Sequence, residues 1–380
     1  MSLEVCLSAS VKYKRNAGGA AWQYLNWALG LRALDCQVIW LETVNPRTAE
    51  NDLREHLTGL KNWLELYGLS GCLALCSPTG QPLPWDASGW YIPFRAAASE
   101  ADLFLNLGYF PECDLACFRR SAFLDTDPGL MQIWMNSGKL NVPRHDVYFT
   151  ESETVGTPDA LVPDCGLRWH YTPLPLFLPL WPVTQADPSA SFTTVSNWWS
   201  KGDFMEFQGE WLSNEKRTAF LDYLELPSRT SVPLELALTL TSSAVDAEER
   251  RSLEQKGWKV RSLWEINWTP EDYRNYVQQS RGEFTCAKPF FVRLQSALIY
   301  DRTLHYMASG KPAVVQHTGP SKFLPDAEGL FRFHNIAEAA SALDAVVSDY
   351  DRHSRLARAL VEEYFDARKV VSSVLERALE

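Results

Sequence analysis

Apolar and polar positions in the first part of the chain repeat with two different periods. Residues 3–9 have the β-prone pattern of a strand. Residues 36–41 (CQVIWL) are apolar apart from Gln37, which is typical of a strand buried on both faces. Between them, residues 20–34 carry apolar side chains at helical spacing. The pattern predicts a strand–helix–strand unit with a Gly-containing turn before the helix.

The same alternation continues toward residue 150. Alternating strands and helices are typical of an open, mostly parallel sheet with helices on both faces. In such sheets, ligands bind beyond the carboxyl ends of the strands. Strands are predicted at residues 72–76, 102–107, 122–125 and 147–150, and a helix is predicted at residues 52–67.

Prolines interrupt residues 162–181, which predicts an extended crossover and not a central strand, because proline fixes φ and lacks a backbone donor. A second series of strands and helices follows. We therefore predict an N-terminal domain at 1–185, a C-terminal domain at 186–365, and a last helix at 366–380 that crosses back to the N-terminal domain. The cleft between two such domains is a common ligand site.

The second series of elements lies between residues 192 and 379. It predicts strands at 192–198, 233–240, 258–263, 283–286 and 311–316, and helices at 214–224, 246–256, 296–309, 335–350, 351–365 and 366–379, with one more helix beginning at Pro270.

Charge and composition narrow the class of protein. The 380 residues include 36 Lys and Arg against 47 Asp and Glu, a formal charge of −11, and a 46% apolar share excludes global disorder. The excess of acid argues against a general nucleic-acid binder, because such binding depends on cationic contacts to phosphate, but it leaves room for one local basic cleft. No segment has the roughly 20 apolar residues that span a bilayer, and the N-terminus lacks a signal-peptide pattern, so we predict a cytoplasmic protein.

Eight cysteines are scattered along the chain. Two C-x3-C pairs, Cys72 with Cys76 and Cys113 with Cys117, have a spacing that metal ligands also use. About 36 residues separate the pairs, which is unlike the compact repeat of a structural zinc site. Buried free thiols are the better interpretation, and we predict no metal site.

Two features of the first half suggest chemistry. Gly18 and Gly19 precede a helix, where free backbone N–H groups bind phosphate or another anion, although the two glycines also suit a simple tight turn. Asp125 and Asp127 lie at the end of a predicted strand, where a carboxylate acts as a general base or orients a hydroxyl. They also suit a cap for the turn at Pro128. The sequence leaves two interpretations open for the glycines, anion binding or a tight turn, and two for the aspartates, catalysis or a turn cap.

One motif resembles a known family. Residues 301–319, DRTLHYMASGKPAVVQHTG, resemble the nucleotide-sugar-binding region of GT-B glycosyltransferases, where a helix ending in M-A-x-G-x-P-V-V leads into a strand and a glycine turn. Residues 18–42 resemble the acceptor domain of the same families. The whole chain is similar to uncharacterised bacterial glycosyltransferases with a family 4-like C-terminal domain, through SRGEF at 280–284 and DTDP at 125–128. The motif is matched by Met307, Ala308, Gly310, Pro312, Val314 and Val315.

The resemblance implies a GT-B fold, with two Rossmann-like βαβ domains facing each other across a cleft. It implies a hexosyltransferase that moves a sugar from a nucleoside-diphosphate sugar, with UDP-glucose as an example, to an acceptor that is a small molecule or a glycan and not nucleic acid. The UDP-sugar is then a co-substrate, and no metal or other cofactor is expected. The alternatives are a nucleotide-sugar epimerase of the same fold, a DNA-modifying glucosyltransferase and a catalytically lapsed sugar-nucleotide-binding protein.

The resemblance also implies which residues bind the donor. Lys216, Arg217 and Lys288 supply positive charge for a diphosphate, and Asp301 accepts from sugar hydroxyls or is simply an acid favoured at a helix N-terminus. Asp125 and Asp127 are the catalytic candidates. The donor set predicted from the sequence is Gly18, Gly19, Lys216, Arg217, Glu283, Lys288, Asp301, Arg302, His305, Thr318 and Gly319.

The retaining families carry a Glu-x7-Glu pair around this helix, and the second Glu of the pair binds ribose. This chain departs from that pattern. Counting back from Gly310, these positions hold Ala297 and His305, so both carboxylates are absent. Asp301 and Glu283 are candidates to replace them. His305 either hydrogen-bonds ribose or phosphate, or is a satisfied histidine within the helix.

Fifteen tryptophans are a large number for one chain. Trp22, Trp27 and Trp40 lie on predicted packed elements and are expected in the core. Eight other tryptophans lie in or beside predicted loops, where aromatic faces stack on sugars or flat acceptors. These are Trp85, Trp90, Trp134, Trp169, Trp181, Trp198, Trp199 and Trp211.

Overall fold

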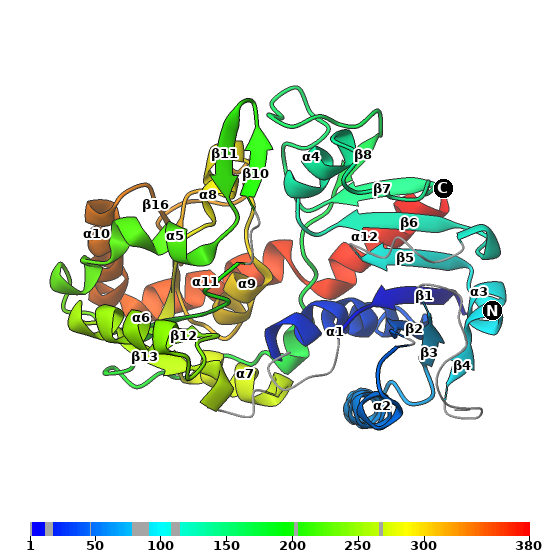
Figure 1. Cartoon of the computed structure of the whole chain (residues 1–380), viewed down its shortest axis with the longest axis horizontal. Helices are drawn as coiled ribbons and strands as arrows, with labels where there is room; N and C mark the ends of the chain where they lie inside the picture. The colour runs from blue at the N-terminus through cyan, green and yellow to red at the C-terminus, as the bar shows by residue number, and fades with distance from the viewer. Residues whose placement is uncertain are drawn as a thin grey trace. The chain divides into compact units, whose positions relative to one another are not determined.

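The computed structural model describes residues 2–11, 18–45, 47–77, 91–107, 115–200, 204–265 and 269–380. The chain divides into two compact units, each built around its own parallel sheet (Figure 1). Unit 1 comprises Met1–Gly156, Val162–Phe177 and Ala367–Glu380, and unit 2 comprises Thr157–Leu161 and Leu178–Asp366. Among the helices within these ranges, none has the length and apolar character needed to cross a bilayer.

The sheet of unit 1 has eight strands in the order β4-β3-β2-β1-β5-β6-β7-β8, all parallel. The strand order reverses between β1 and β5. The strands are β1 (Glu4–Ala9), β2 (Gln37–Thr43), β3 (Leu73–Cys76), β4 (Ile92–Pro93), β5 (Leu103–Leu107), β6 (Ser121–Asp125), β7 (Val147–Thr150) and β8 (Trp169–Tyr171). The helices are α1 (Gly18–Arg32), α2 (Glu50–Leu66), α3 (Phe94–Glu100), α4 (Leu130–Asn136) and α12 (Ala367–Leu379).

Helix α12 packs directly on α1 although the two are far apart in sequence. A Cβ placed on Gly30 of α1 would lie 2.7 Å from Cγ2 of Val371 and 3.2 Å from the Cβ of Ala367. Only glycine therefore permits this approach of the two helices. The contact explains why the last helix of the chain belongs to unit 1.

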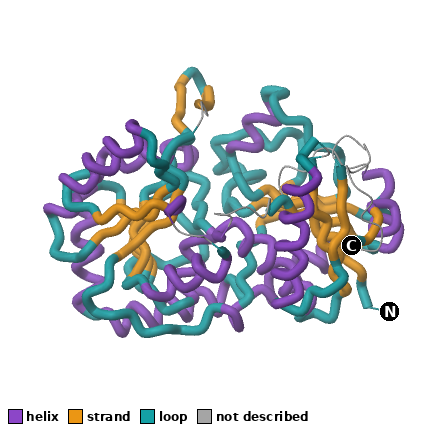
Figure 2. Tube along the Cα trace, turned by 60° about the horizontal axis from the view of Figure 1, so that its bottom comes forward, coloured by secondary structure: helices purple, strands orange, loops and turns teal. Residues whose placement is uncertain are grey.

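The sheet of unit 2 has six parallel strands in the order β13-β12-β9-β14-β15-β16. This is the doubly wound order 3-2-1-4-5-6, and it reverses between β9 and β14. In Figure 2 the strands of this sheet form a layer with helices around it. The strands are β9 (Phe192–Ser196), β12 (Leu234–Leu238), β13 (Lys259–Ser262), β14 (Gly282–Thr285), β15 (Ala313–Gln316) and β16 (Leu330–Phe333), and a separate hairpin is formed by β10 (Phe204–Phe207) and β11 (Glu210–Ser213). The helices are α5 (Lys216–Phe220), α6 (Ala244–Gln255), α7 (Pro270–Gln279), α8 (Pro289–Leu294), α9 (Asp301–Ala308), α10 (Ile336–Ser348) and α11 (Tyr350–Tyr364).

The helix predicted at 296–309 is wrong in its first turn, because α9 begins at Asp301. Gln295 and Ala297 have φ values of 48° and 55°, which are in the left-handed region and cannot continue a right-handed helix. The N–H of Ala297 donates instead to the carbonyl of Thr318 at 2.9 Å. A tertiary contact thus replaces the first turn that the sequence pattern suggests.

The core contains more of the tryptophans than the sequence predicts. Trp22, Trp27 and Trp40 are buried, which confirms their expected place. Trp169, Trp181 and Trp198 are also buried, so the expectation that these three offer faces to a ligand is wrong. The reason is that each meets a partner inside its unit. Trp199 and Trp211 are exposed, Trp134 is half-buried, and Trp85 and Trp90 lie outside the described residues.

Candidate functional site

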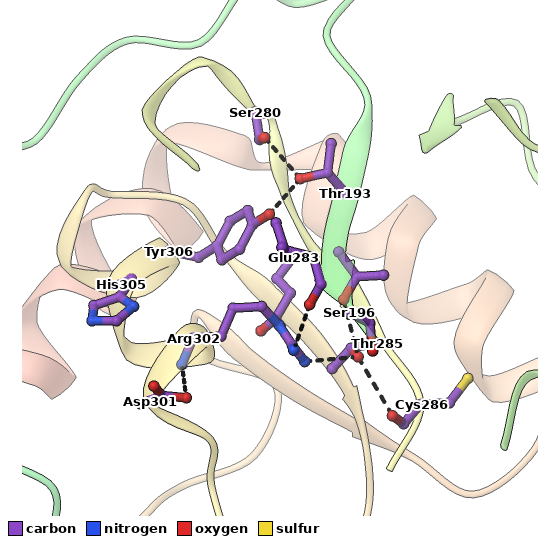
Figure 3. Close-up of polar contacts among 12 residues, drawn as sticks. Thr193, Ser196, Ser280, Glu283, Thr285, Cys286, Asp301, Arg302, His305 and Tyr306 are labelled. Carbon is purple, nitrogen blue, oxygen red and sulfur yellow. Dashed lines mark hydrogen bonds and ion pairs between the residues drawn. The ribbon is translucent and has the colours of Figure 1, made fainter. Parts of the chain in front are cut away.

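Arg302 lies where the strand order of unit 2 reverses. Its guanidinium donates from Nη1 to the carbonyl of Val195 on β9 at 2.8 Å and from Nη2 to Oγ1 of Thr285 on β14 at 3.0 Å (Figure 3). Its Nε donates to Oε1 of Glu283 at 2.7 Å. Arg302 therefore joins the carboxyl ends of β9 and β14, which is the place where doubly wound sheets bind ligands.

Glu283 holds Arg302 from within the core. Its side chain is fully buried, and its Oε2 has no hydrogen-bond partner among the described residues. Burial acts to lower the pKa of Arg302, but the charge of Glu283 outweighs burial and raises that pKa above its ordinary value. Two guanidinium N–H groups remain beyond the three bonds described, and the Arg302 side chain is 14% exposed. Arg302 thus has a fixed position and donors to spare.

Lys216 brings a second positive charge to the same place. It begins α5, is buried, donates from Nζ to the carbonyl of Cys286 just after β14, and lies 4.9 Å from the ring centre of Tyr300. Burial first, and then the charges of Arg302 and Lys288, hold the pKa of Lys216 well below its ordinary value. We name Lys216, Lys288 and Arg302 the cationic cluster. Its mutual repulsion favours an anion between its members.

Arg217 and Lys288 differ in their surroundings. Lys288 is half-buried at the N-terminal boundary of α8. Arg217 pairs with Glu249 at 2.6 Å and its guanidinium lies 5.2 Å from the ring centre of Trp199. The structure therefore joins Lys288 electrostatically to the cluster, whereas it directs Arg217 to a surface pair with α6.

His305 lies in the core and not at the cationic cluster. Its ring stacks on Trp181 with centres 4.3 Å apart, and its Nδ1 lies 3.0 Å from the hydroxyl of Tyr273. Burial, with the charge of Arg302 in addition, lowers the pKa of His305 to about 3, so the ring is neutral. Figure 3 shows His305 pointing away from the pair of Arg302 and Glu283. Of the two interpretations of His305, this placement matches a satisfied helix histidine.

The turn at Thr318 and Gly319 supports the segment before α9. Gly319 has φ of 130°, and a Cβ there would lie 2.5 Å from the carbonyl oxygen of Gln295. Oγ1 of Thr318 donates to the carbonyl of Leu298 at 2.7 Å. Asp301, half-buried at the first position of α9, accepts from the backbone N–H of Arg302 at 2.7 Å. These residues fix where α9 begins, and through it the position of Arg302.

In unit 1, Asp125 is a fully buried carboxylate at the end of β6. It accepts hydrogen bonds from Nε2 of Gln132 at 2.7 Å, from Oγ1 of Thr150 at 3.0 Å and from the backbone N–H of Asp127 at 3.1 Å. Burial raises its pKa to about 7 despite these donors. The carboxylate matches the turn-capping interpretation, while Asp127 is half-buried on the turn that Asp125 holds.

Gly18 and Gly19 are the first residues of α1, and Gly18 is buried. The loop that precedes them, residues 12–17, lies outside the described residues, as does Cys113. No three His, Cys, Asp or Glu side chains within the described ranges come together in a way that could hold a metal ion. Cys72 and Cys76 are buried and form no disulfide.

Sequence patterns missed several groups around the cluster. The carbonyls of Val195 and Cys286 and the hydroxyl of Thr285 contact the two buried cations directly. Nearer the amino end of β9, the hydroxyls of Thr193 and Tyr306 are 2.5 Å apart (Figure 3). The strand order carries the missing signal, because the residues that end the first and fourth strands of such a sheet face one crevice.

Comparison with solved structures reveals the same architecture over the whole chain. The Anabaena HepE complex with UDP-glucose has a TM-score of 0.60, 12% sequence identity, and coverage of 99% of this chain and 100% of that chain. An alpha-glucosyltransferase (AGT) in complex with UDP has a TM-score of 0.60 and 9% identity, covering 100% of both chains. The chain has the GT-B fold.

A third GT-B structure agrees. Sucrose-phosphate synthase from Thermosynechococcus elongatus has a TM-score of 0.54 and 11% identity, covering 99% of this chain and 98% of that chain. No family model matches the sequence, and no curated protein matches it either. The expected GT-B fold is therefore confirmed by the structural comparison, although the sequence comparisons find no match.

Proposed function

We propose that this protein is a glycosyltransferase that transfers a hexose from a UDP-sugar to an acceptor. The observation that carries the proposal is the cationic cluster at the carboxyl ends of β9 and β14, in a chain whose overall charge is −11. It is supported by the GT-B fold shared with proteins solved in complex with UDP and UDP-glucose.

The cluster acts on the diphosphate of the donor. Arg302 offers two unused N–H donors and Lys216 the rest of its ammonium group, while Lys288 adds a third charge. As the sugar leaves, negative charge grows on the diphosphate, and prearranged cations stabilise it without reorganising. Glu283 positions Arg302, and Asp301, Thr318 and Gly319 position the start of α9.

The acceptor is assigned to unit 1, with Asp127 as the carboxylate that orients the acceptor hydroxyl or takes its proton. Asp125 positions the turn that carries Asp127, through the hydrogen bond to its backbone. One structural neighbour was solved with DNA. We propose a small-molecule or glycan acceptor instead, because a chain with formal charge −11 is poorly suited to bind a polyanion.

Calorimetric titration with UDP and an assay of UDP-glucose hydrolysis test the proposal. Lys216→Met and Arg302→Met should each weaken UDP binding about tenfold or more, because each removes a charged hydrogen-bond donor to phosphate. Lys256→Met is the matched control, since Lys256 forms an exposed pair with Glu225.

The outcomes separate the candidate functions. UDP binding that depends on Lys216 and Arg302, together with slow release of glucose from UDP-glucose, supports a transferase. UDP binding without turnover would instead indicate a sugar-nucleotide-binding protein. Equal UDP affinity in wild type, Lys216→Met and Arg302→Met would overturn the assignment of the donor site.

A further inference from the structure

A second cationic feature lies in unit 1, at the amino ends of β6, β7 and β8. A hollow of about 680 Å³ is lined there by four arginines, Arg120, Arg144, Arg168 and Arg377, which we name the arginine hollow. Arg120 immediately precedes β6, Arg168 immediately precedes β8, and Arg144 lies shortly before β7. Arg377 lies in α12, which ends beside β7 (Figure 1). Four separate segments therefore bring a guanidinium to one place.

The hollow is on the opposite edge of the unit 1 sheet from Asp125. Asp125 ends β6 at the carboxyl edge, and Ser121 begins it beside the hollow. At about 3.3 Å per residue, these ends are roughly 13 Å apart. The arginine hollow is thus distinct from both the catalytic candidates of unit 1 and the cationic cluster of unit 2.

Positive charge in the hollow exceeds the negative charge that could balance it. The acidic side chains on its wall are Asp146 and Glu380. Oδ2 of Asp146 already accepts from the backbone N–H of Ser121 at 2.8 Å, and Glu380 lies 3.8 Å from Arg377 in an exposed pair. No described residue forms an ion pair or a hydrogen bond with the side chain of Arg144 or Arg168, and both are exposed.

Hydrogen bonds hold His145 and Tyr148 in place on the wall of the hollow. The backbone N–H of His145 donates to the hydroxyl of Tyr148 at 2.8 Å, and Nδ1 of His145 donates to the carbonyl of Pro143 at 2.7 Å. Burial lowers the pKa of His145 to about 4, so its ring stays neutral and adds no charge. Because the Tyr148 hydroxyl accepts, its own proton is available to an oxygen of a ligand.

We propose that the arginine hollow is a second anion-binding site that takes a small organic molecule carrying two phosphate groups. Guanidinium groups bind phosphate through paired N–H donors, and four of them around one hollow exceed what a single phosphate uses. The volume is within the range of small-molecule sites and leaves room for the carbon skeleton between the phosphates. Tyr148 and Leu167 supply the apolar surface for that skeleton.

Fructose 1,6-bisphosphate is the probe, in calorimetric titrations of the full chain at low salt. We expect saturable binding that weakens about tenfold or more in the double variant Arg144→Ala, Arg168→Ala, because two charged phosphate contacts are lost. The control double variant Arg47→Ala, Arg95→Ala removes two exposed arginines of unit 1 that do not line the hollow, and should bind within about twofold of wild type. Lys216→Met should behave like the control, which separates this site from the cationic cluster.

Chemical protection locates the probe. Arg144 and Arg168 should react with phenylglyoxal in the free protein and be protected by the bisphosphate, as read by mass spectrometry of their peptides. Fructose alone should protect neither residue. The absence of saturable binding, equal affinity in the hollow variant and wild type, or equal losses in the hollow and control variants would each overturn the proposal.

Discussion

Replacing Glu283 by glutamine tests whether the buried ion pair with Arg302 maintains the fold as well as the site. The substitution keeps the shape of the side chain but leaves the guanidinium without its counter-charge, 14% exposed in the core. Breaking a buried pair costs about 3–5 kcal/mol, and an amide oxygen that still accepts from Nε places Glu283→Gln near 3 kcal/mol. For a unit of roughly 190 residues this corresponds to a fall in melting temperature of about 6–12 °C.

The measurement must report on unit 2 alone, because a chain with two compact units need not unfold in one step. Hydrogen exchange of peptides from β14 and α9 during urea unfolding does so. The matched control is Glu225→Gln, whose partner Lys256 is 41% exposed and which should cost less than about 1 kcal/mol.

A double variant separates stability from binding. Glu283→Met with Arg302→Met replaces both charges by apolar side chains of similar size, which is often neutral or stabilising for a buried pair. We expect stability close to wild type and no UDP binding. If Glu283→Gln unfolds at the same urea concentration as wild type, the pair contributes no net stability and the reasoning is refuted.

Three further substitutions test other parts of the structure. The pKa of Asp125 is raised to about 7 in the folded chain, so the folded state binds the proton more tightly and unit 1 should lose stability as pH rises from about 4 to 7. Asp125→Asn should flatten this pH dependence of urea unfolding. An Asp125→Asn profile identical to that of wild type would contradict the prediction. His305→Glu places a carboxylate against Trp181 and Tyr273, so it should lower stability by about 2 kcal/mol or more without strengthening UDP binding; tighter binding would show that the position reaches the donor. Gly319→Ala brings a Cβ within 2.5 Å of the Gln295 carbonyl and should weaken UDP binding. Gly138 also has a positive φ, of 71°, but open space around it, so Gly138→Ala should cost only about 1 kcal/mol and leave UDP affinity unchanged.

Local patterns predicted most of the strands and helices because both sheets are parallel and buried. Residues 38–41 and 72–76 are apolar throughout, and β2 and β3 form there. The hairpin of β10 and β11 and the short helix α8 were missed, because each is a short segment in which a charged residue interrupts the apolar pattern.

The candidate site could be predicted in part. The resemblance named Lys216, Lys288 and Arg302 as donor candidates, and the structure places Lys216 and Arg302 at the carboxyl ends of β9 and β14 with Lys288 nearby. Their role in donor binding stays a prediction. What the sequence could not show is burial. His305 follows the same helical period whether it faces a ligand or Trp181, and Asp125 ends its strand in either of its two roles. Such choices depend on tertiary partners that lie far away in the chain.

The contact of Gly30 with α12 has a consequence for biosynthesis. Unit 1 is assembled from the beginning of the chain and from its last helix, with nearly all of unit 2 inserted between them. On the ribosome, unit 2 can complete its sheet before α12 has been synthesised. The surface of α1 around Gly30 stays uncovered during that time. Until translation reaches Ala367, the apolar surface that Gly30 keeps open for Val371 has no cover, and a nascent chain stalled there would present it to chaperones.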